Sequence, residues 1–368
     1  MWKKLLLGLI CVILVAAGAI TWTGWSLSVP MTAEDEAMIR QSPNFSDETF
    51  VNAEPEAGLD ITLESLNDEF FGEQQRVPPG DIPVVEMDPS FLDGKPEPGL
   101  RVTWLGHAST LVEIDGYRVL TDPVFSERAS PFASIGPKRF HPTPLPLNQL
   151  KNIDAVVISH NHYDHLDKET ILHLAGEGAR ILVPLGNGGL LRSWKIPPKQ
   201  IVEMDWWQEN KLGDLTLVAT PARHYSSRGF FDYQKTLWLS WTIVGPRNRV
   251  FFSGDSGYAK SFAEIGERFG PFQFSLIKIG AYGPGQYWVD IHMPPEQAVQ
   301  VHKDVSGEVM LPVHWATFNL ARHDWDEPVK RAIAAAEKAG IVLVTPKVGE
   351  TIRFGEAFQS SNWWELVR

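Results

Sequence analysis

Four side chains that commonly bind metals fall within one six-residue stretch, residues 160–165 with the sequence HNHYDH. An apolar run at residues 155–158 precedes it and predicts a buried strand that ends where the polar residues begin. In extended backbone, side chains two residues apart point to the same side, so His160 and His162 can share one metal ion. The last two residues of the stretch lie where the chain must turn and point to a second position nearby. Burying four polar side chains together without a metal would be costly, so the pattern favours a metal site over a solvated polar loop.

Three further candidates follow apolar strands downstream. His224 comes after the strand predicted at residues 215–218, and Asp255 and His314 end the apolar runs 250–255 and 309–314. Sheets of the α/β type present their chemistry at such strand ends. Taken singly, each residue could be a cap or a satisfied polar group. Together with residues 160–165, they favour a site for two metal ions.

The arrangement of predicted strands and helices points to a layered fold. Strands are expected at residues 101–105, 110–114 and 118–121, and the pair Asp115-Gly116 predicts a tight hairpin between the last two. Helices are expected at residues 168–174, 295–304 and 327–339, the last ended by Gly340. Strands in two groups with helices outside predict two sheets packed face to face and covered by helices.

The charge of the chain is concentrated in one segment. The 368 residues carry a formal net charge of -12. Residues 34–97 hold 17 acidic and 3 basic side chains, which leaves 28 acidic and 30 basic in the remainder. We therefore expect an acidic, Pro-rich extension at residues 30–99, a nearly neutral body at 100–355 and a tail at 356–368. Neither part has the basic stripe of a nucleic-acid binder, so no nucleic-acid partner is expected.

The first 29 residues predict a membrane segment. Lys3 and Lys4 precede an uncharged stretch that is long enough to span a bilayer. The positive-inside rule places the two lysines in the cytoplasm and the body on the non-cytoplasmic side, which is the periplasm in a bacterium. The alternative is a signal peptide cleaved near residues 17–19. The single cysteine, Cys11, lies in this segment, so no internal disulfide and no cysteine ligand are expected in the body.

The metal-ligand pattern resembles that of the metallo-β-lactamase superfamily, whose fold is an αββα four-layer sandwich. Further motifs between about residues 100 and 349 resemble N-acylphosphatidylethanolamine-hydrolysing phospholipases D. The ascorbate-6-phosphate lactonase group is a more distant resemblance. The resembling segments are residues 103–108, 120–123, 136–140, 205–207, 254–258, 279–282 and 314–318.

The resemblance implies a ligand set and a reaction. His160, His162 and His224 would hold one zinc ion, while Asp164, His165 and His314 would hold a second, with Asp255 bridging. The implied reaction is cleavage of N-acylphosphatidylethanolamine, a membrane phospholipid, into N-acylethanolamine and phosphatidic acid by a metal-bound hydroxide. A lactonase or a broader phosphodiesterase is the alternative. The sequence does not decide between a monomer and a homodimer.

Other residues near these motifs are candidates for supporting roles. Asp122 is expected to accept a hydrogen bond from a ligand imidazole, with a turn aspartate as the alternative. His292 would bind phosphate or protonate the leaving group, Tyr163 would contact the headgroup or only pack, and His107 is either near the site or structural. Residue Ile291 and the segment 283–288 depart from the family pattern, which leaves the substrate open. The residues expected to carry catalysis are Asp122, Asp164, Asp255 and His292.

Overall fold

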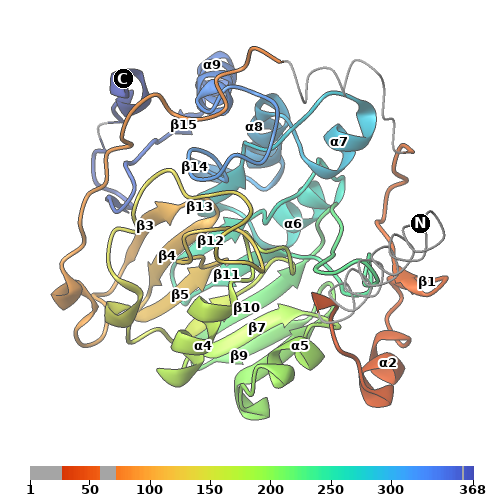
Figure 1. Cartoon of the computed structure of the whole chain (residues 1–368). Coiled ribbons are helices and arrows are strands. Elements are labelled where there is room, and N and C mark those ends of the chain that lie inside the picture. The colour runs from red at the N-terminus through yellow and green to blue at the C-terminus, as the bar shows by residue number, and fades with distance from the viewer. Residues whose placement is uncertain (1–26, 59–71, 359) are drawn as a thin grey trace, which may run out of the picture.

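The computed structural model describes residues 27–58, 72–358 and 360–368. Two seven-stranded sheets pack face to face with helices on their outer faces (Figure 1). The first sheet has the order β16-β3-β4-β5-β6-β7-β8, and the second has the order β15-β14-β13-β12-β11-β10-β9. The predicted αββα sandwich is therefore confirmed.

The strands of the first sheet are β3 (Leu100–Gly106), β4 (Ser109–Ile114), β5 (Tyr117–Thr121), β6 (Ala155–Val157), β7 (Arg180–Pro184), β8 (Ile201–Met204) and β16 (Thr351–Arg353). Those of the second are β9 (Glu209–Leu212), β10 (Leu215–Thr220), β11 (Ser240–Val244), β12 (Arg249–Phe252), β13 (Phe272–Lys278), β14 (Gly307–Val313) and β15 (Val342–Leu343). A small separate hairpin joins β1 (Phe45–Ser46) and β2 (Thr49–Phe50).

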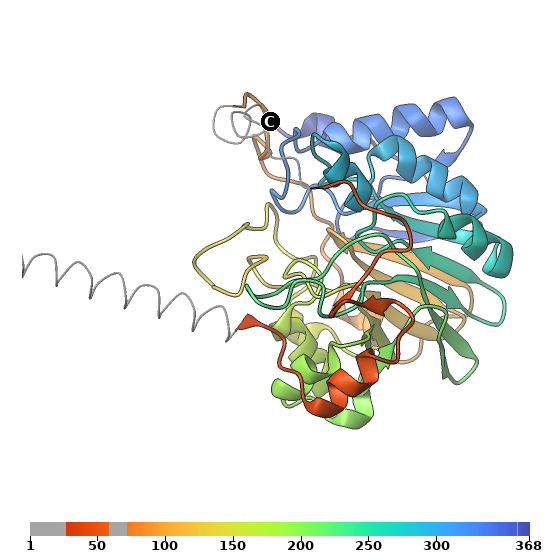
Figure 2. The same cartoon turned by 90° about the vertical axis from the view of Figure 1, so that its right-hand side faces the viewer.

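Helices cover the outer face of each sheet. The first sheet is covered by α4 (Lys168–Gly176) and α5 (Gly188–Ser193), and the second by α6 (Ser261–Phe269), α8 (Pro295–Asp304) and α9 (Glu327–Ala339). The view in Figure 2, turned by 90° from that of Figure 1, shows the two helix layers on opposite sides of the pair of sheets. The other helices in the described part of the chain are α2 (Ala33–Ile39), α7 (Gln286–Ile291), and the 3-10 turns η1 (Pro89–Leu92), η2 (Leu147–Gln149), η3 (Pro198–Gln200) and η4 (Trp363–Leu366).

Alternating side chains of the first sheet serve two separate cores. Val119 of β5 faces the core between the sheets, whereas its neighbour Leu120 faces the layer under α4. In β7, Leu182 faces the first of these cores and Val183 the second. Successive side chains of a strand point to opposite faces, so a sheet buried on both sides must be apolar throughout. The nearly continuous apolar runs in the sequence have this cause.

The predicted local elements agree closely with the observed ones. The helices at residues 295–304 and 327–339 have the predicted bounds, and α9 ends at Gly340 in the left-handed conformation, with φ 66°. The hairpin between β4 and β5 pairs Ile114 with Tyr117, so Asp115 and Gly116 form its two-residue turn. Both turn residues have positive φ, as the predicted turn requires.

The prediction of a membrane localisation needs a correction. Within the described ranges 27–58, 72–358 and 360–368, no helix combines the length and the apolar character needed to cross a bilayer. Most of the predicted span at residues 1–29 lies outside those ranges. The localisation derived from this segment is not retained.

Candidate metal centre

The candidate ligands lie where strands of both sheets end. In the first sheet β5, β6, β7 and β8 run parallel, and residues 160–165 follow the end of β6. In the second sheet β12, β13 and β14 run parallel, and Asp255 and His314 follow β12 and β14. The carboxyl ends of parallel strands meet at one edge of a sheet. This topology brings residues more than 150 positions apart to one site.

Three imidazoles form the first cluster. Nε2 of His160 lies 2.7 Å from Nδ1 of His162, and Nε2 of His224 lies 3.3 Å from the same atom. The ring centroids are 4.3 to 5.1 Å apart, and the rings meet edge to face. One nitrogen of each ring can therefore face a common point, which suits a single cation.

A carboxylate and two imidazoles form the second cluster. Nε2 of His165 lies 3.2 Å from Oδ2 of Asp164 and 3.1 Å from Nε2 of His314. Nε2 of His314 is 3.4 Å from the same carboxylate oxygen. His107, whose position the sequence left open, joins this cluster, because its Nε2 lies 2.9 Å from Oδ2 of Asp164.

Asp255 lies between the two clusters. Its Oδ2 is 3.7 Å from Nε2 of His224 in the first cluster, and 3.7 and 3.2 Å from Nε2 of His165 and of His314 in the second. Its other oxygen, Oδ1, lies 3.2 Å from Nζ of Lys278 and 2.9 Å from Nδ1 of His292. One oxygen thus faces the ligand histidines while the other is held from behind.

Hydrogen bonds behind the clusters fix the orientation of the rings. Nδ1 of His165 lies 2.6 Å from Oδ2 of the buried Asp122, and Nδ1 of His224 lies 3.0 Å from the carbonyl of Ile291. Oγ of Ser159 lies 2.9 Å from Nδ1 of His160, and the backbone N–H of Ser159 donates to Asp122 at 2.6 Å. An imidazole that donates through one nitrogen presents the lone pair of the other, which is the form that binds metals. Asp122 thus lies within hydrogen-bond distance of a candidate ligand imidazole.

The electrostatics of the site favour metal binding. Burial lowers the pKa of His162 and of His224 to about 3, so both rings stay neutral at physiological pH. Burial acts to raise the pKa of Asp255, but the adjacent His292, His314 and Lys278 hold it well below its usual range. Burial acts to lower the pKa of His165, but Asp164 and Asp122 hold it well above its usual range, so this ring would have to lose a proton to bind a metal. Imidazoles and carboxylates without a thiolate form a donor set that suits zinc, iron or manganese. The residues present therefore fit a metal centre.

Several site residues have unusual backbone conformations. His107, Asp122 and His314 have φ values of 53°, 35° and 63°. The left-handed region is unfavourable for residues with a Cβ and is found where the surrounding structure enforces it, often at functional sites. Gly254 has φ 60°, and a Cβ there would lie 2.7 Å from both the carbonyl oxygen of Leu239 and Cβ of Ser159. The turn that presents Asp255 thus requires glycine.

Two residues of the site were not singled out in the sequence. Lys278 ends β13 with an inaccessible side chain, and burial lowers its pKa to about 8 against the opposing effect of Asp255. In the sequence, Lys278 is recognisable as a lone lysine in the apolar run of residues 274–279. Ser159, directly before the histidine cluster, carried no comparable signal.

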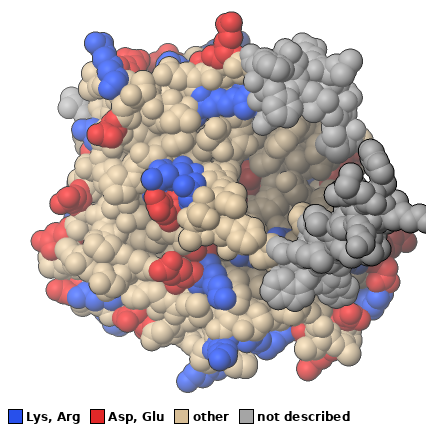
Figure 3. Space-filling view, in the orientation of Figure 1, with Lys and Arg blue, Asp and Glu red and all other residues tan. Residues whose placement is uncertain are grey.

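The candidate substrate residues differ in their surroundings. His292 lies against Asp255, and the ring of Trp288 stacks on it at 5.4 Å. The hydroxyl of Tyr163 donates to the carbonyl of Arg228 at 3.1 Å, and that guanidinium lies 3.9 Å from the Tyr163 ring. Tyr163 also lines a separate cavity of about 610 Å³, so its predicted headgroup contact stays a prediction. On the face seen in Figure 3, charged side chains are scattered among uncharged ones, and the surface is hollowed beside the grey residues.

Comparisons with known proteins agree with this geometry. Residues 117–315 match the family model described as beta-lactamase superfamily domain. An uncharacterised protein of Mycobacterium tuberculosis is 46% identical over 91% of this chain and 90% of its own length. N-acyl-phosphatidylethanolamine-hydrolyzing phospholipase D 1 of Caenorhabditis elegans is 33% identical over 72% of this chain and 77% of its own length. The metallo hydrolase Igni18 of Ignicoccus hospitalis has a similar fold, with a TM-score of 0.54, 24% identity, and coverage of 70% of this chain and 99% of its own. This chain therefore belongs to the metallo-β-lactamase superfamily and is a hydrolase of that superfamily.

Proposed function

We propose that this hydrolase is a phosphodiesterase of the phospholipase D type. Its substrate is N-acylphosphatidylethanolamine, and its products are N-acylethanolamine and phosphatidic acid. The observation that carries the proposal is the pair of ligand clusters joined by Oδ2 of Asp255, which suits two cations that share one phosphodiester. The similarity to the Caenorhabditis elegans phospholipase D, which hydrolyses N-acylphosphatidylethanolamine, supports the choice of lipid.

The two clusters divide the ligands between two zinc ions. His160, His162 and His224 would hold one, and Asp164, His165 and His314 the other, with Asp255 shared. When bound, such a pair of ions lowers the pKa of a water molecule and neutralises charge on the phosphate oxygens.

Two groups of the chain keep the ligands in place before the substrate arrives. Asp122 holds His165 through Nδ1, so the ring cannot turn its other nitrogen away from the site. Asp255 is held at Oδ1 by Lys278, so Oδ2 remains directed at the histidines. Catalysis of this kind depends on groups that need little rearrangement during the reaction.

His292 is placed to move a proton. Its Nδ1 lies against Asp255 and Lys278, which leaves Nε2 for the substrate. Hydrolysis adds the oxygen of water to phosphorus. It breaks the bond between phosphorus and the oxygen that becomes the hydroxyl group of N-acylethanolamine. The departing oxygen must gain a proton. Burial lowers the pKa of His292 to about 4, so the neutral ring would first take the proton released by the attacking water and then give it to the departing oxygen.

The test is product analysis with purified protein. Incubation with N-acylphosphatidylethanolamine in detergent micelles should release N-acylethanolamine and phosphatidic acid in equal amounts. His162→Ala should abolish release, whereas His173→Ala should retain it, because His173 lies on α4 and bonds to the carbonyl of Leu150 outside the site. A panel of lactones tested in parallel addresses the alternative. Turnover of lactones without turnover of the lipid would contradict the proposal.

A further inference from the structure

One residue of the acidic extension holds a candidate metal ligand from behind. Nδ2 of Asn52, which follows β2, donates to the backbone carbonyl of His224 at 2.7 Å. The backbone N–H of His224 in turn donates to Oδ1 of Asn52 at 3.1 Å. His224 is buried, so its backbone groups need partners within the protein. One side chain supplies a partner to both of them.

The surroundings of Asn52 suit an amide. Its Oδ1 accepts a second hydrogen bond, from the indole Nε1 of Trp238 at 2.8 Å, and its Nδ2 also donates to the carboxylate of Glu56. An amide has an acceptor on one side and two donors on the other, so it satisfies all four neighbours. An aspartate would set an oxygen against the carbonyl of His224 and against Glu56. A leucine of similar size would leave these groups without a partner.

The same part of the extension also contacts the helix that orients the ring of this ligand. The backbone N–H of Ala57 donates to Oδ2 of Asp290 in α7 at 2.8 Å. The next residue, Ile291, ends α7, and its carbonyl lies 3.0 Å from Nδ1 of His224. Residues 52–57 therefore hold the backbone of the ligand directly and its ring through α7.

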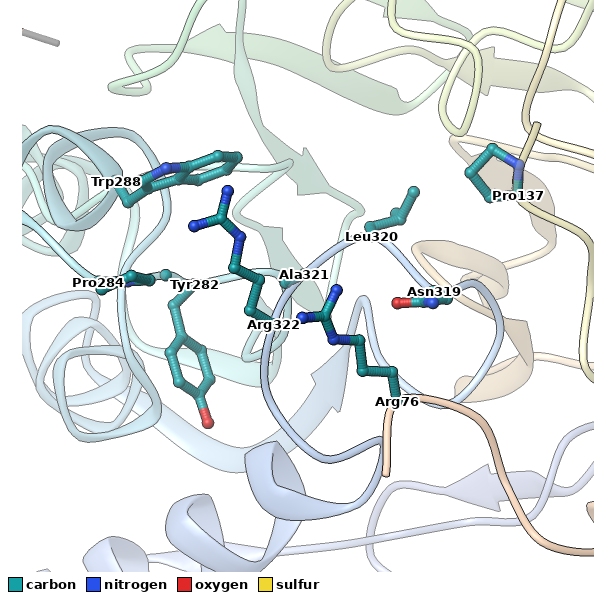
Figure 4. Close-up of a pocket in the computed structure, with 10 residues that line it drawn as sticks. Arg76, Pro137, Tyr282, Pro284, Trp288, Asn319, Leu320, Ala321 and Arg322 are labelled. Carbon is teal, nitrogen blue, oxygen red and sulfur yellow. The ribbon is translucent and has the colours of Figure 1, made fainter. Parts of the chain in front are cut away.

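The helix α7 also contributes to a cavity near the metal centre. Figure 4 shows Trp288 of α7 beside a cavity of about 350 Å³, which Tyr282 and Leu320 also line. The ring of Trp288 stacks on that of His292, which lies against Asp255. The contact between the extension and α7 thus reaches the surroundings of the metal centre as well as one of its ligands.

We propose that Asn52 is a positioning residue for the first cluster, and that the extension thereby forms part of the metal centre. The two hydrogen bonds fix the backbone of His224, so its Nε2 stays directed towards His162, 3.3 Å from Nδ1 of that ring. Groups that hold a ligand from behind typically change metal affinity by about 10- to 100-fold. The inference rests on the proposed division of the ligands between two cations.

Zinc affinity measured with one cluster at a time tests this role. His314→Ala keeps the three histidines of the first cluster, and His162→Ala keeps the second cluster. Added to His314→Ala, Asn52→Leu should weaken zinc binding about tenfold, whereas added to His162→Ala it should leave binding unchanged. Competition with a chromophoric chelator gives the affinities. Asn44→Leu is the matched control, because it removes another bond from the extension to the body, from Nδ2 of Asn44 to Oδ1 of Asp205 at 2.8 Å, and should alter neither affinity.

The outcomes separate positioning from a general loss of structure. Equal weakening by Asn52→Leu in both backgrounds, or equal weakening by Asn44→Leu, would mean that the contact is only structural and would overturn the inference. Unchanged affinity in both backgrounds would also overturn it, while two zinc ions bound by wild-type protein would leave the proposed function standing. If circular dichroism shows that Asn52→Leu does not fold, Asn52→Ala takes its place with the same expectations. Wild-type protein that binds no zinc would overturn this inference and the proposed function together.

Discussion

Lys278 places its ammonium group 3.2 Å from Oδ1 of Asp255, with side chains that are 0% and 3% exposed. A buried charge is tolerated when it is paired, and removing one partner leaves the other uncompensated. Asp255 is also the residue that joins the two ligand clusters. This buried pair therefore links the stability of the fold to the geometry of the metal centre.

Lys278→Met should destabilise the metal-free protein. The uncompensated Asp255 carboxylate lowers the free energy of unfolding by about 3 kcal/mol. Bound metal compensates the same carboxylate, so the loss should be smaller in metal-loaded protein. Urea denaturation with and without a chelator measures both values. Lys199→Met, at an exposed site, is the control, and an equal loss in the two states would contradict the role given to Asp255.

Asp122→Asn should weaken metal binding without removing a ligand. The amide keeps an oxygen near Nδ1 of His165 but loses the negative charge that makes the ring a stronger donor. Such changes behind a ligand typically lower metal affinity by about 10- to 100-fold. Competition with a chromophoric zinc chelator gives the affinity. Asp93→Asn, in an exposed ion pair with Lys151, should bind as wild type does, and unchanged affinity in Asp122→Asn would refute the role of Asp122.

Gly254→Ala should cost far more than alanine at another left-handed glycine. Gly254 and Gly340 have similar φ values of 60° and 66°. Of these two glycines, Gly254 alone lies where an added Cβ would clash with neighbouring atoms. We expect a loss of about 3 kcal/mol for Gly254→Ala and about 1 kcal/mol for Gly340→Ala. Thermal denaturation of the two variants compares them directly. Equal losses would mean that the turn before Asp255 is not tightly packed.

Glu113→Gln should reveal a second buried network. Glu113 accepts hydrogen bonds from Nε of Arg118 at 3.0 Å and from Nη2 of Arg101 at 2.9 Å, and all three residues are buried. Neutralising the carboxylate leaves two guanidinium groups together, so we expect a loss of about 3 to 5 kcal/mol. Glu264→Gln, whose exposed side chain pairs with Arg268, should cost less than about 1 kcal/mol. Chemical denaturation of both variants measures the difference.

The sequence was informative where a local pattern determined the structure. Apolar strands ended by His or Asp predicted which residues come together, because parallel strands bring their carboxyl ends to one edge. The helices at residues 295–304 and 327–339 followed from periodicity and from Gly340. The family resemblance supplied the assignment of ligands to two ions.

Other features depended on packing that no local pattern encodes. Lys278 is buried because β13 ends against Asp255, a contact between separate strands. The role of His107 could not be predicted from the sequence, because only the fold brings this residue to Asp164. The short helix α7 falls in a segment that departs from the family pattern. The prediction of a membrane location was wrong, because no helix among the described residues is long and apolar enough to cross a bilayer.

Metal analysis of the purified protein tests the central claim most directly. Loosely bound metal is first removed from the protein. Elemental mass spectrometry should then find two zinc ions or equivalent divalent ions per chain. His162→Ala should retain about one, because it removes a ligand from the first cluster alone. Fully active protein that contains no transition metal, or a His162→Ala variant with unchanged metal content, would contradict the account.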